Sequence, residues 1–259
     1  MAVPIVVMVV VAVALLLAIA YLTTVVPTRW LKVEHVDAKL GLGITVLQIS
    51  DIHIERMRVK VERLVSLIAT EKPALLLLTG DFIDEDRYLG RLNAFLKPLI
   101  DTGVPAVAVL GNHDYFMDDV ERLIGLLHER GITVLQNHLV TVGTLQIAGI
   151  DDYCTGRHDM TVLEAADPTR PLILVTHDPT ITLSLRKPYD YLVAGHLHGK
   201  QFAIPFLFQL QDFGPLARSG VYKGLHESEQ GRFYISKGLG QSGVNLRFLV
   251  RSEVTVHRL

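Results

Sequence analysis

Short apolar runs and stretches with helical spacing alternate along most of the chain. Apolar runs that predict buried strands cover residues 44–49, 74–78, 104–110, 172–175 and 189–193. Helical spacing of apolar residues predicts helices around residues 59–68, 89–100 and 120–130. Three short runs predict antiparallel strands at residues 132–135, 139–142 and 145–150, and two further strands are expected at 232–235 and 246–256. Alternation early in the chain and hairpins late in it predict an α/β protein whose mixed sheets pack together between helices.

The beginning of the chain breaks this pattern. Residues 2–20 carry no charged side chain, and the first charged side chain belongs to Arg29. About 20 apolar residues are enough for a helix to cross a bilayer, whereas a core helix would be expected to have a polar face. We therefore expect an N-terminal transmembrane helix, with residues 1–28 as the anchor, 29–43 as a tether and 44–259 as the folded domain.

Two features near this segment bear on its fate and orientation. Ala18-Ile19-Ala20 matches a signal-peptidase site, which leaves cleavage open, although no basic residue precedes the apolar run. Arg29 and Lys32 follow the apolar run and favour a cytoplasmic position for the domain. We expect an uncleaved, single-pass protein of the cell membrane.

Composition excludes some classes of function. The chain has 259 residues, of which 49% are hydrophobic and 20% charged, with a net charge of -2. It can bury one sizeable core, and it lacks the basic excess typical of nucleic-acid binding, so no nucleic-acid partner is expected. Cys154 is its only cysteine, which excludes an intramolecular disulfide.

Polar residues follow five of the predicted buried runs. They are Asp51 and His53, Asp81, Asn112 and His113, His177, and His196 and His198. A single histidine at a strand end is more often structural, but the recurrence points to one site, because carboxyl ends of strands converge in α/β sheets. Carboxylate, carboxamide and imidazole donors without thiolate suit a first-row ion such as Mn, Fe or Zn.

The number of donors bears on the chemistry. Two divalent ions that share Asp81 would use all seven candidate ligands, which are Asp51, His53, Asp81, Asn112, His177, His196 and His198. Two ions about 3.5–4 Å apart can activate water against a phosphate ester. His113 is then free to protonate the leaving oxygen, and the nearby Asp84 would orient its ring or serve as an ordinary helix N-cap.

The motifs resemble those of the calcineurin-like metallophosphoesterase family, in its membrane-attached YkuE-like or YaeI-like branch. The family pattern is DxH, GDxxD, GNHD, a lone His and GHxH, matched here by residues 51–53, 80–84, 111–114, 177 and 195–198. The resemblance covers roughly residues 31–250. It implies a four-layer sandwich of two mixed β-sheets flanked by helices. It also implies that Asp51, His53, Asp81 and His198 hold one ion, and that Asp81, Asn112, His177 and His196 hold the other.

Some features depart from this branch or compete with it. The branch commonly reads GHTHGGQ, whereas Leu197 and Lys200 stand here, so we consider Lys200 as a contact to substrate phosphate. Residues 238–243 match GxGxxG, but strand-like sequence follows instead of the helix that a dinucleotide site requires. Phe206 and Phe208 lie in an apolar stretch that either packs beneath the sheets or receives the acyl part of a lipid.

The sequence therefore predicts a membrane-anchored, two-metal metallophosphoesterase, with residues 44–259 as its catalytic domain. The substrate would be a phosphomonoester, phosphodiester or pyrophosphate, with Mn the first ion to test. A narrower alternative is a lipid-linked pyrophosphate hydrolase of the UDP-2,3-diacylglucosamine type. From another class, the chain could be a catalytically inactive, metal-binding membrane scaffold.

Overall fold

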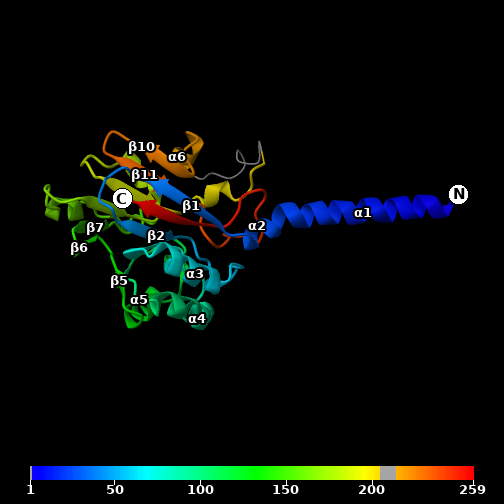
Figure 1. The fold of residues 1–259 in the computed structure, drawn as a ribbon, viewed down its shortest axis with the longest axis horizontal. Helices are drawn as coiled ribbons and strands as arrows, with labels where there is room; N and C mark the ends of the chain where they lie inside the picture. Colours follow the sequence, from blue (N-terminus) through cyan, green and yellow to red (C-terminus); the bar gives the residue numbers. More distant parts are fainter. Residues whose placement is uncertain (1, 205–213) are drawn as a thin grey trace.

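The computed structural model describes residues 2–204 and 214–259, which form two packed six-stranded sheets and one projecting helix (Figure 1). The first sheet has the order β1 (Lys32–Asp37), β12 (Glu253–Arg258), β2 (Thr45–Ile49), β3 (Leu75–Thr79), β4 (Ala106–Val109) and β5 (Ile132–Val134). The second has the order β10 (Gly224–Glu227), β11 (Arg232–Ile235), β9 (Tyr191–Ala194), β8 (Leu172–Val175), β7 (Leu145–Gly149) and β6 (His138–Val142). Both sheets are mixed: β12–β2, β10–β11 and β6–β7 pair antiparallel, and the remaining pairs are parallel.

The central strands are apolar at every position because both of their faces are covered. In β3, Leu76 and Leu78 pack against the helices, whereas Leu75 and Leu77 face the second sheet. Successive side chains of a strand point to opposite faces, so a strand between two layers needs apolar residues throughout. This explains why apolar runs without alternation predicted these strands correctly.

Helical layers cover the outer faces of both sheets, as the α/β sandwich prediction required. The first sheet is covered by α3 (Val61–Glu71), α4 (Leu89–Ile100) and α5 (Val120–Glu129). The second is covered by shorter elements, which are η3 (Met160–Ala165), η4 (Pro179–Leu183) and α6 (Gly214–Arg218). Three further 3₁₀ turns lie in loops, at Asp86–Tyr88 (η1), Asp114–Phe116 (η2) and His198–Lys200 (η5). The predicted four-layer arrangement is confirmed.

Several expected boundaries differ from the structure. Residues 29–43, expected as a tether, contain β1, an edge strand whose mostly polar sequence hides its pairing with β12. The run at 132–135 was expected in a hairpin, but β5 pairs parallel to β4, because α5 forms a crossover between them. The last strand begins at Glu253 instead of residue 246, and β10 was not expected at all.

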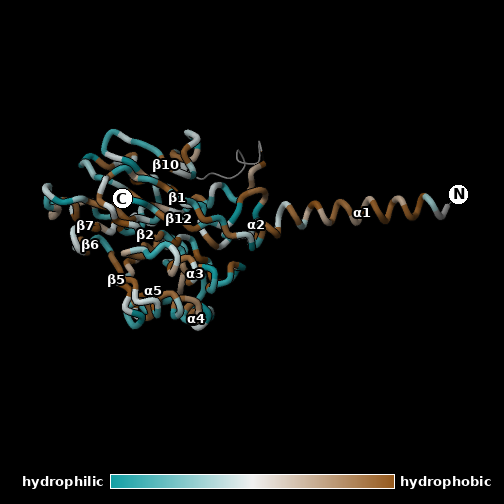
Figure 2. Tube along the Cα trace, in the orientation of Figure 1, coloured by the Kyte–Doolittle hydropathy of each residue, from teal (hydrophilic) through white to brown (hydrophobic). Residues whose placement is uncertain are grey.

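The N-terminal helix α1 (Ala2–Thr24) leaves the sandwich as a separate rod (Figure 1). It is followed by the short helix α2 (Val26–Arg29). The segment Pro4–Arg29 is long and apolar enough to cross a membrane, and its most apolar part is not buried against the described domain. Figure 2 shows α1 as hydrophobic along most of its length. Such a helix is unfavourable in water, and it has the character of an anchor or a signal sequence.

Candidate metal centre

Loops from both sheets bring the predicted metal-binding side chains together. Asp51 and His53 follow β2, Asp81 follows β3, and Asn112 follows β4. His177 follows β8, and the pair His196 and His198 follows β9. All of these residues stand at the carboxyl ends of strands that run parallel to a neighbour, so the two sheets point their loops toward one place.

The donor atoms form two groups that share Asp81. The first contains Asp51, His53, Asp81 and His198, and the second contains Asp81, His177 and His196; within each group the ligand atoms lie within 4.8 Å of one another. Oδ2 of Asp81 lies 3.3 Å from Nε2 of His53 and 3.2 Å from Nε2 of His177. One carboxylate therefore stands between the two groups, as a bridging ligand would.

The residues fit a pair of cations. His53 and His198 face each other with 3.2 Å between their Nε2 atoms, and Nδ1 of His196 lies 3.2 Å from Nε2 of His177. Oδ1 of Asn112 is buried and has no hydrogen-bond partner among the described residues. Buried acceptors without partners are costly, and a cation would satisfy the donor set.

The backbone at these residues is strained. Asp51, Asp81 and His196 have φ angles of 49°, 55° and 70°, and His53 and His198 have 38° and 47°. Each such residue costs on the order of 1–3 kcal/mol, and this strain persists only where the surrounding structure enforces it. The loops therefore give up stability to hold these side chains in place.

Two glycines allow the loops to approach each other. A Cβ atom on Gly195 would lie 2.0 Å from Oγ of Ser50 and 2.4 Å from Oδ2 of Asp51. A Cβ atom on Gly238 would lie 2.5 Å from the Cβ atom of Asp51. The glycine at the start of the GxGxxG match at residues 238–243 is therefore explained by its contact with the loop that carries Asp51.

Asp114 is an organising residue whose role was not predicted from sequence. Its buried carboxylate accepts hydrogen bonds from the backbone N–H groups of Asp81, Phe82 and Gly111 at 2.9, 2.7 and 2.8 Å. It thereby joins the loops after β3 and β4. The GNHD motif gave the residue, but only the structure gives its partners.

Arg247 is a second residue that sequence reasoning missed. Its side chain is fully buried, donates to the carbonyl oxygens of Lys237 and Gly238 at 2.8 and 3.1 Å, and lies 3.4 Å from Nδ1 of His198. Burial lowers the pKa of Arg247 to about 10, against the opposing charges of Asp51 and Glu253. The only signal in the sequence was an arginine within a predicted strand.

The electrostatics around Asp81 favour cations. Burial alone would lower the pKa of His53, but hydrogen bonds to Asp81 and Asp84 outweigh it and raise this pKa to about 10. Burial opposes ionisation of Asp81, yet its contacts with His177 and His53 hold its pKa well below the usual value. A negative field that attracts protons so strongly also attracts metal ions, which compete with protons for the same donors.

His113 and Asp84 lie beside the first donor group. Nδ1 of His113 is 3.1 Å from Oδ1 of Asp84 without the alignment of a hydrogen bond, and its Nε2 is 3.3 Å from Oγ of Ser242. Asp84 also forms an ion pair with Arg56 at 2.6 Å. Burial opposes ionisation of Asp84, but contacts with His113, His53 and Arg56 lower its pKa. The carboxylate is therefore charged beside the imidazole.

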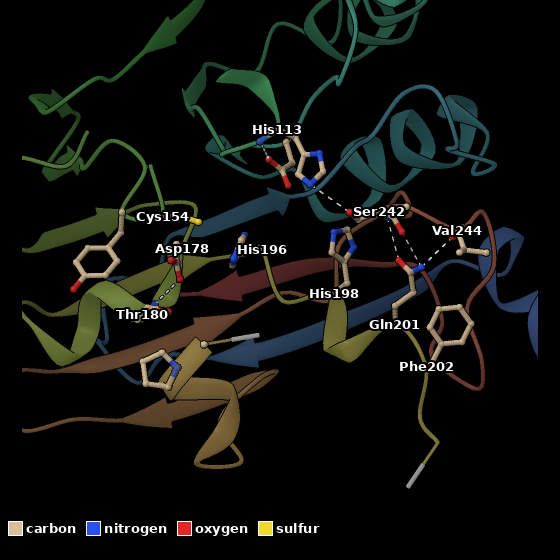
Figure 3. A pocket seen from close by; sticks show the side chains of 15 residues that line it. His113, Cys154, Asp178, Thr180, His196, His198, Gln201, Phe202, Ser242 and Val244 are labelled. Atoms are coloured by element: carbon tan, nitrogen blue, oxygen red, sulfur yellow. Dashed lines mark hydrogen bonds between the residues drawn. The ribbon is translucent and has the colours of Figure 1, made fainter. Parts of the chain in front are cut away.

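A cavity of about 670 Å³ opens over the cluster (Figure 3). Asp81, His113, His196 and His198 line it. One of its sides carries the polar residues Asp178 and Thr180, and the other carries Gln201, Phe202 and Val244. Tyr153 also lines the cavity.

Of the three residues considered for substrate contact, the structure describes Lys200. The ammonium group of Lys200 lies over the ring of Tyr222, 4.4 Å from its centroid. A contact with substrate phosphate stays a prediction. Phe206 and Phe208 lie outside the described residues.

The fold and the site together define a metal-dependent hydrolase, with His and Asp donors at the carboxyl ends of strands from two packed sheets. The family model for calcineurin-like phosphoesterases matches residues 44–200. The chain belongs to the calcineurin-like phosphoesterase family and is a metal-dependent phosphoesterase, as its motifs predicted.

Two relatives agree with this assignment, and a solved structure agrees with the fold. The chain is 38% identical to the metallophosphoesterase YkoQ of Bacillus subtilis, over 90% of this chain and 92% of the relative. It is 30% identical to the phosphodiesterase YaeI of Escherichia coli, over 83% and 81% of the two chains. One solved structure superposes with a TM-score of 0.50 at 14% identity, covering 73% of this chain and 89% of the other, and it supports the fold.

Proposed function

We propose that this protein is a membrane-anchored phosphoesterase that holds two divalent ions and hydrolyses a phosphomonoester, phosphodiester or pyrophosphate. Asp51, His53, Asp81 and His198 would hold one ion, and Asp81, Asn112, His177 and His196 the other. The ions, of the class Mn, Fe or Zn, would supply Lewis acidity and an activated water. The observation that carries the proposal is the position of Asp81, whose carboxylate belongs to both donor groups.

His113 is the proposed proton donor to the leaving oxygen. Its ring lines the cavity beside the cluster, and its Nε2 is directed to Ser242 at the cavity wall. The charged carboxylate of Asp84 lies 3.1 Å from Nδ1 and would hold the orientation of the ring. A scaffold that binds metal only for stability would need neither this histidine nor an open cavity.

The proposed membrane anchor favours substrates that are linked to lipids. Most of Pro4–Arg29 projects from the domain, and its apolar surface has no cover in the described structure. An enzyme tethered in this way stays close to lipids, which supports lipid-linked phosphoesters as substrates, including a pyrophosphate of the UDP-2,3-diacylglucosamine type. YaeI, similar along most of its length, is named a phosphodiesterase, which supports diester cleavage here.

The test is hydrolysis of bis-p-nitrophenyl phosphate by the detergent-solubilised full chain with added Mn, Fe or Zn. Asn112→Ala should lower kcat by about 10²–10³, because the second ion would lose a ligand and would stabilise charge at the reacting centre less well. The matched control is Asn93→Ala on α4, which loses a contact with Arg130 and should keep activity. An inactive wild-type chain with all three metals would support the scaffold, and equal activity of both variants would remove Asn112 from the site.

A further inference from the structure

The cavity lies next to the place where the N-terminal helix joins the domain. Figure 1 shows the yellow segment that ends at residue 204 and the orange-to-red segment around 240–250 on the side from which α1 leaves. Figure 3 places Gln201, Phe202 and Val244 together on one side of the cavity, beside the blue N-terminal ribbon. One wall of the cavity therefore belongs to the same region as the helix exit.

Backbone hydrogen bonds fix this region to the helix. The N–H groups of Arg247 and Leu249 donate to the carbonyl oxygens of Thr24 and Thr23 at 3.0 and 3.1 Å. The N–H group of Ser252 donates to the carbonyl oxygen of Pro27 at 3.0 Å. Residues 247–252 therefore lie at the level of the last turn of α1 and the short helix after it. In a membrane, that level is the interface with water.

Large apolar side chains are exposed at this level. The exposed fractions are 55% for Trp30, 58% for Val244 and 61% for Leu249. Leu249 also has a φ angle of 57°, a left-handed conformation that is unfavourable for leucine. A strained leucine with most of its side chain in water has no benefit for a soluble surface, but the same side chain would gain free energy in contact with lipid.

Aromatic and basic side chains at the same level fit a lipid headgroup region. The guanidinium of Arg251 stacks on the ring of Trp30, 4.0 Å from its centroid, and its Nη2 donates to the carbonyl oxygen of Leu31. Arg29 is exposed and lies 3.4 Å from the hydroxyl oxygen of Tyr21. Tryptophan, tyrosine and arginine are the residues that gather at membrane interfaces.

We propose that Trp30, Val244 and Leu249 form a rim that docks on the bilayer surface beside the cavity mouth, and that a lipid phosphoester enters the cavity along it. The inference rests on the proposed function and adds a route and an orientation for the substrate. The apolar part of the substrate lies toward Phe202 and Val244, and its polar part lies toward Asp178 and Thr180 on the opposite side.

Membrane contact is tested first, without any use of activity. Trp30 is the only tryptophan, so Trp30→Phe gives a silent background in which Leu249→Trp reports on the rim. Leu225→Trp on β10 is the matched control, because Leu225 is also exposed, at 43%, but lies on a different edge of the domain. In vesicles of lipids brominated on the acyl chain, we expect strong quenching at position 249 and little at 225. Equal quenching at the two positions, or none at 249, overturns the rim.

The route of entry is tested with two substrates that share one leaving group. The full chain in vesicles is given soluble bis-p-nitrophenyl phosphate or vesicle-embedded phosphatidyl-p-nitrophenol. Leu249→Asn suits the left-handed backbone and removes the apolar contact, so we expect the ratio of lipid to soluble activity to fall about tenfold. Leu225→Asn should leave this ratio unchanged. An unchanged ratio in Leu249→Asn overturns the inference alone, whereas hydrolysis of neither substrate by the wild type overturns the proposed function.

Discussion

At the scale of single residues, a substitution of His113 tests proton transfer separately from metal binding. If it protonates the leaving oxygen, His113→Gln should lower kcat by about 10²–10⁴ for an alkyl leaving group. The loss should be small for p-nitrophenolate, which leaves without a proton. The measurement is kcat for a series of phosphodiesters with leaving groups of different pKa, together with the metal content of the variant. Equal losses across the series would contradict the role of proton donor.

His257 gives a prediction for stability against pH. It lies fully buried between the two sheets, where it contacts Gln48 and the rings of Tyr191 and Tyr234. Burial lowers its pKa from 6.5 to about 3. Between these values, the unfolded chain binds a proton that the folded chain does not, so stability falls as pH falls.

The expected slope is at most about 1.4 kcal/mol per pH unit below pH 6.5. His257→Gln cannot bind this proton, so its unfolding free energy should fall less steeply between pH 6 and pH 4. Urea unfolding followed by circular dichroism at several pH values measures both slopes. Parallel slopes in the two proteins would show that His257 does not set the acid sensitivity.

The residues of the site were predictable to different degrees. Side chains such as Asp81 and His177 follow apolar runs, and strand ends converge whatever the details of the loops, so the sequence could place them together. Asp114 and Arg247 could not be assigned in this way. Their partners are backbone groups of loops, and the choice of partner depends on the path of each loop.

At the scale of elements, close loop packing after β9 makes Gly195 sensitive. Gly195→Ala places a Cβ atom against Ser50 and Asp51, so the loops must separate, and metal affinity should fall by about 10- to 100-fold. Gly125→Ala is the matched control in α5, because nothing lies within 4 Å of its new Cβ atom. It should raise stability by about 0.5–1 kcal/mol. Metal titration and thermal unfolding of both variants test the pair, and equal metal affinity would contradict the account.

The predictability of each element followed its burial. Strands with both faces covered, such as β3 and β8, stood out as continuous apolar runs. The edge strands β1 and β10 gave no such signal, because most of their side chains are partly or fully exposed. In addition, β1 pairs with β12, which lies at the other end of the chain. β5 pairs parallel to β4 because α5 forms a crossover between them. A prediction based on local hairpins does not include such a crossover.

At the scale of the whole molecule, retention of the N-terminal helix is expected for an anchor, and its removal is expected for a signal sequence. If the apolar segment is retained, chain extracted from membranes should have the full mass of 28.8 kDa and should resist alkaline carbonate washing. Cleavage after Ala20 would remove most of α1 and leave Thr23 and Thr24, the residues that bind segment 247–249. Intact mass spectrometry measures the outcome directly, and a shortened chain would contradict the anchor.

The proposed hydrolysis depends most on two ions that share the carboxylate of Asp81. The direct measurement is the metal content of the full chain after loading with Mn and removal of excess metal, beside Asp81→Asn and the surface control Asp101→Asn. We predict two ions per chain in the wild type and the control, and no more than one in Asp81→Asn, with loss of hydrolysis. One ion or none in the wild type, or two ions retained by Asp81→Asn, would contradict the shared centre.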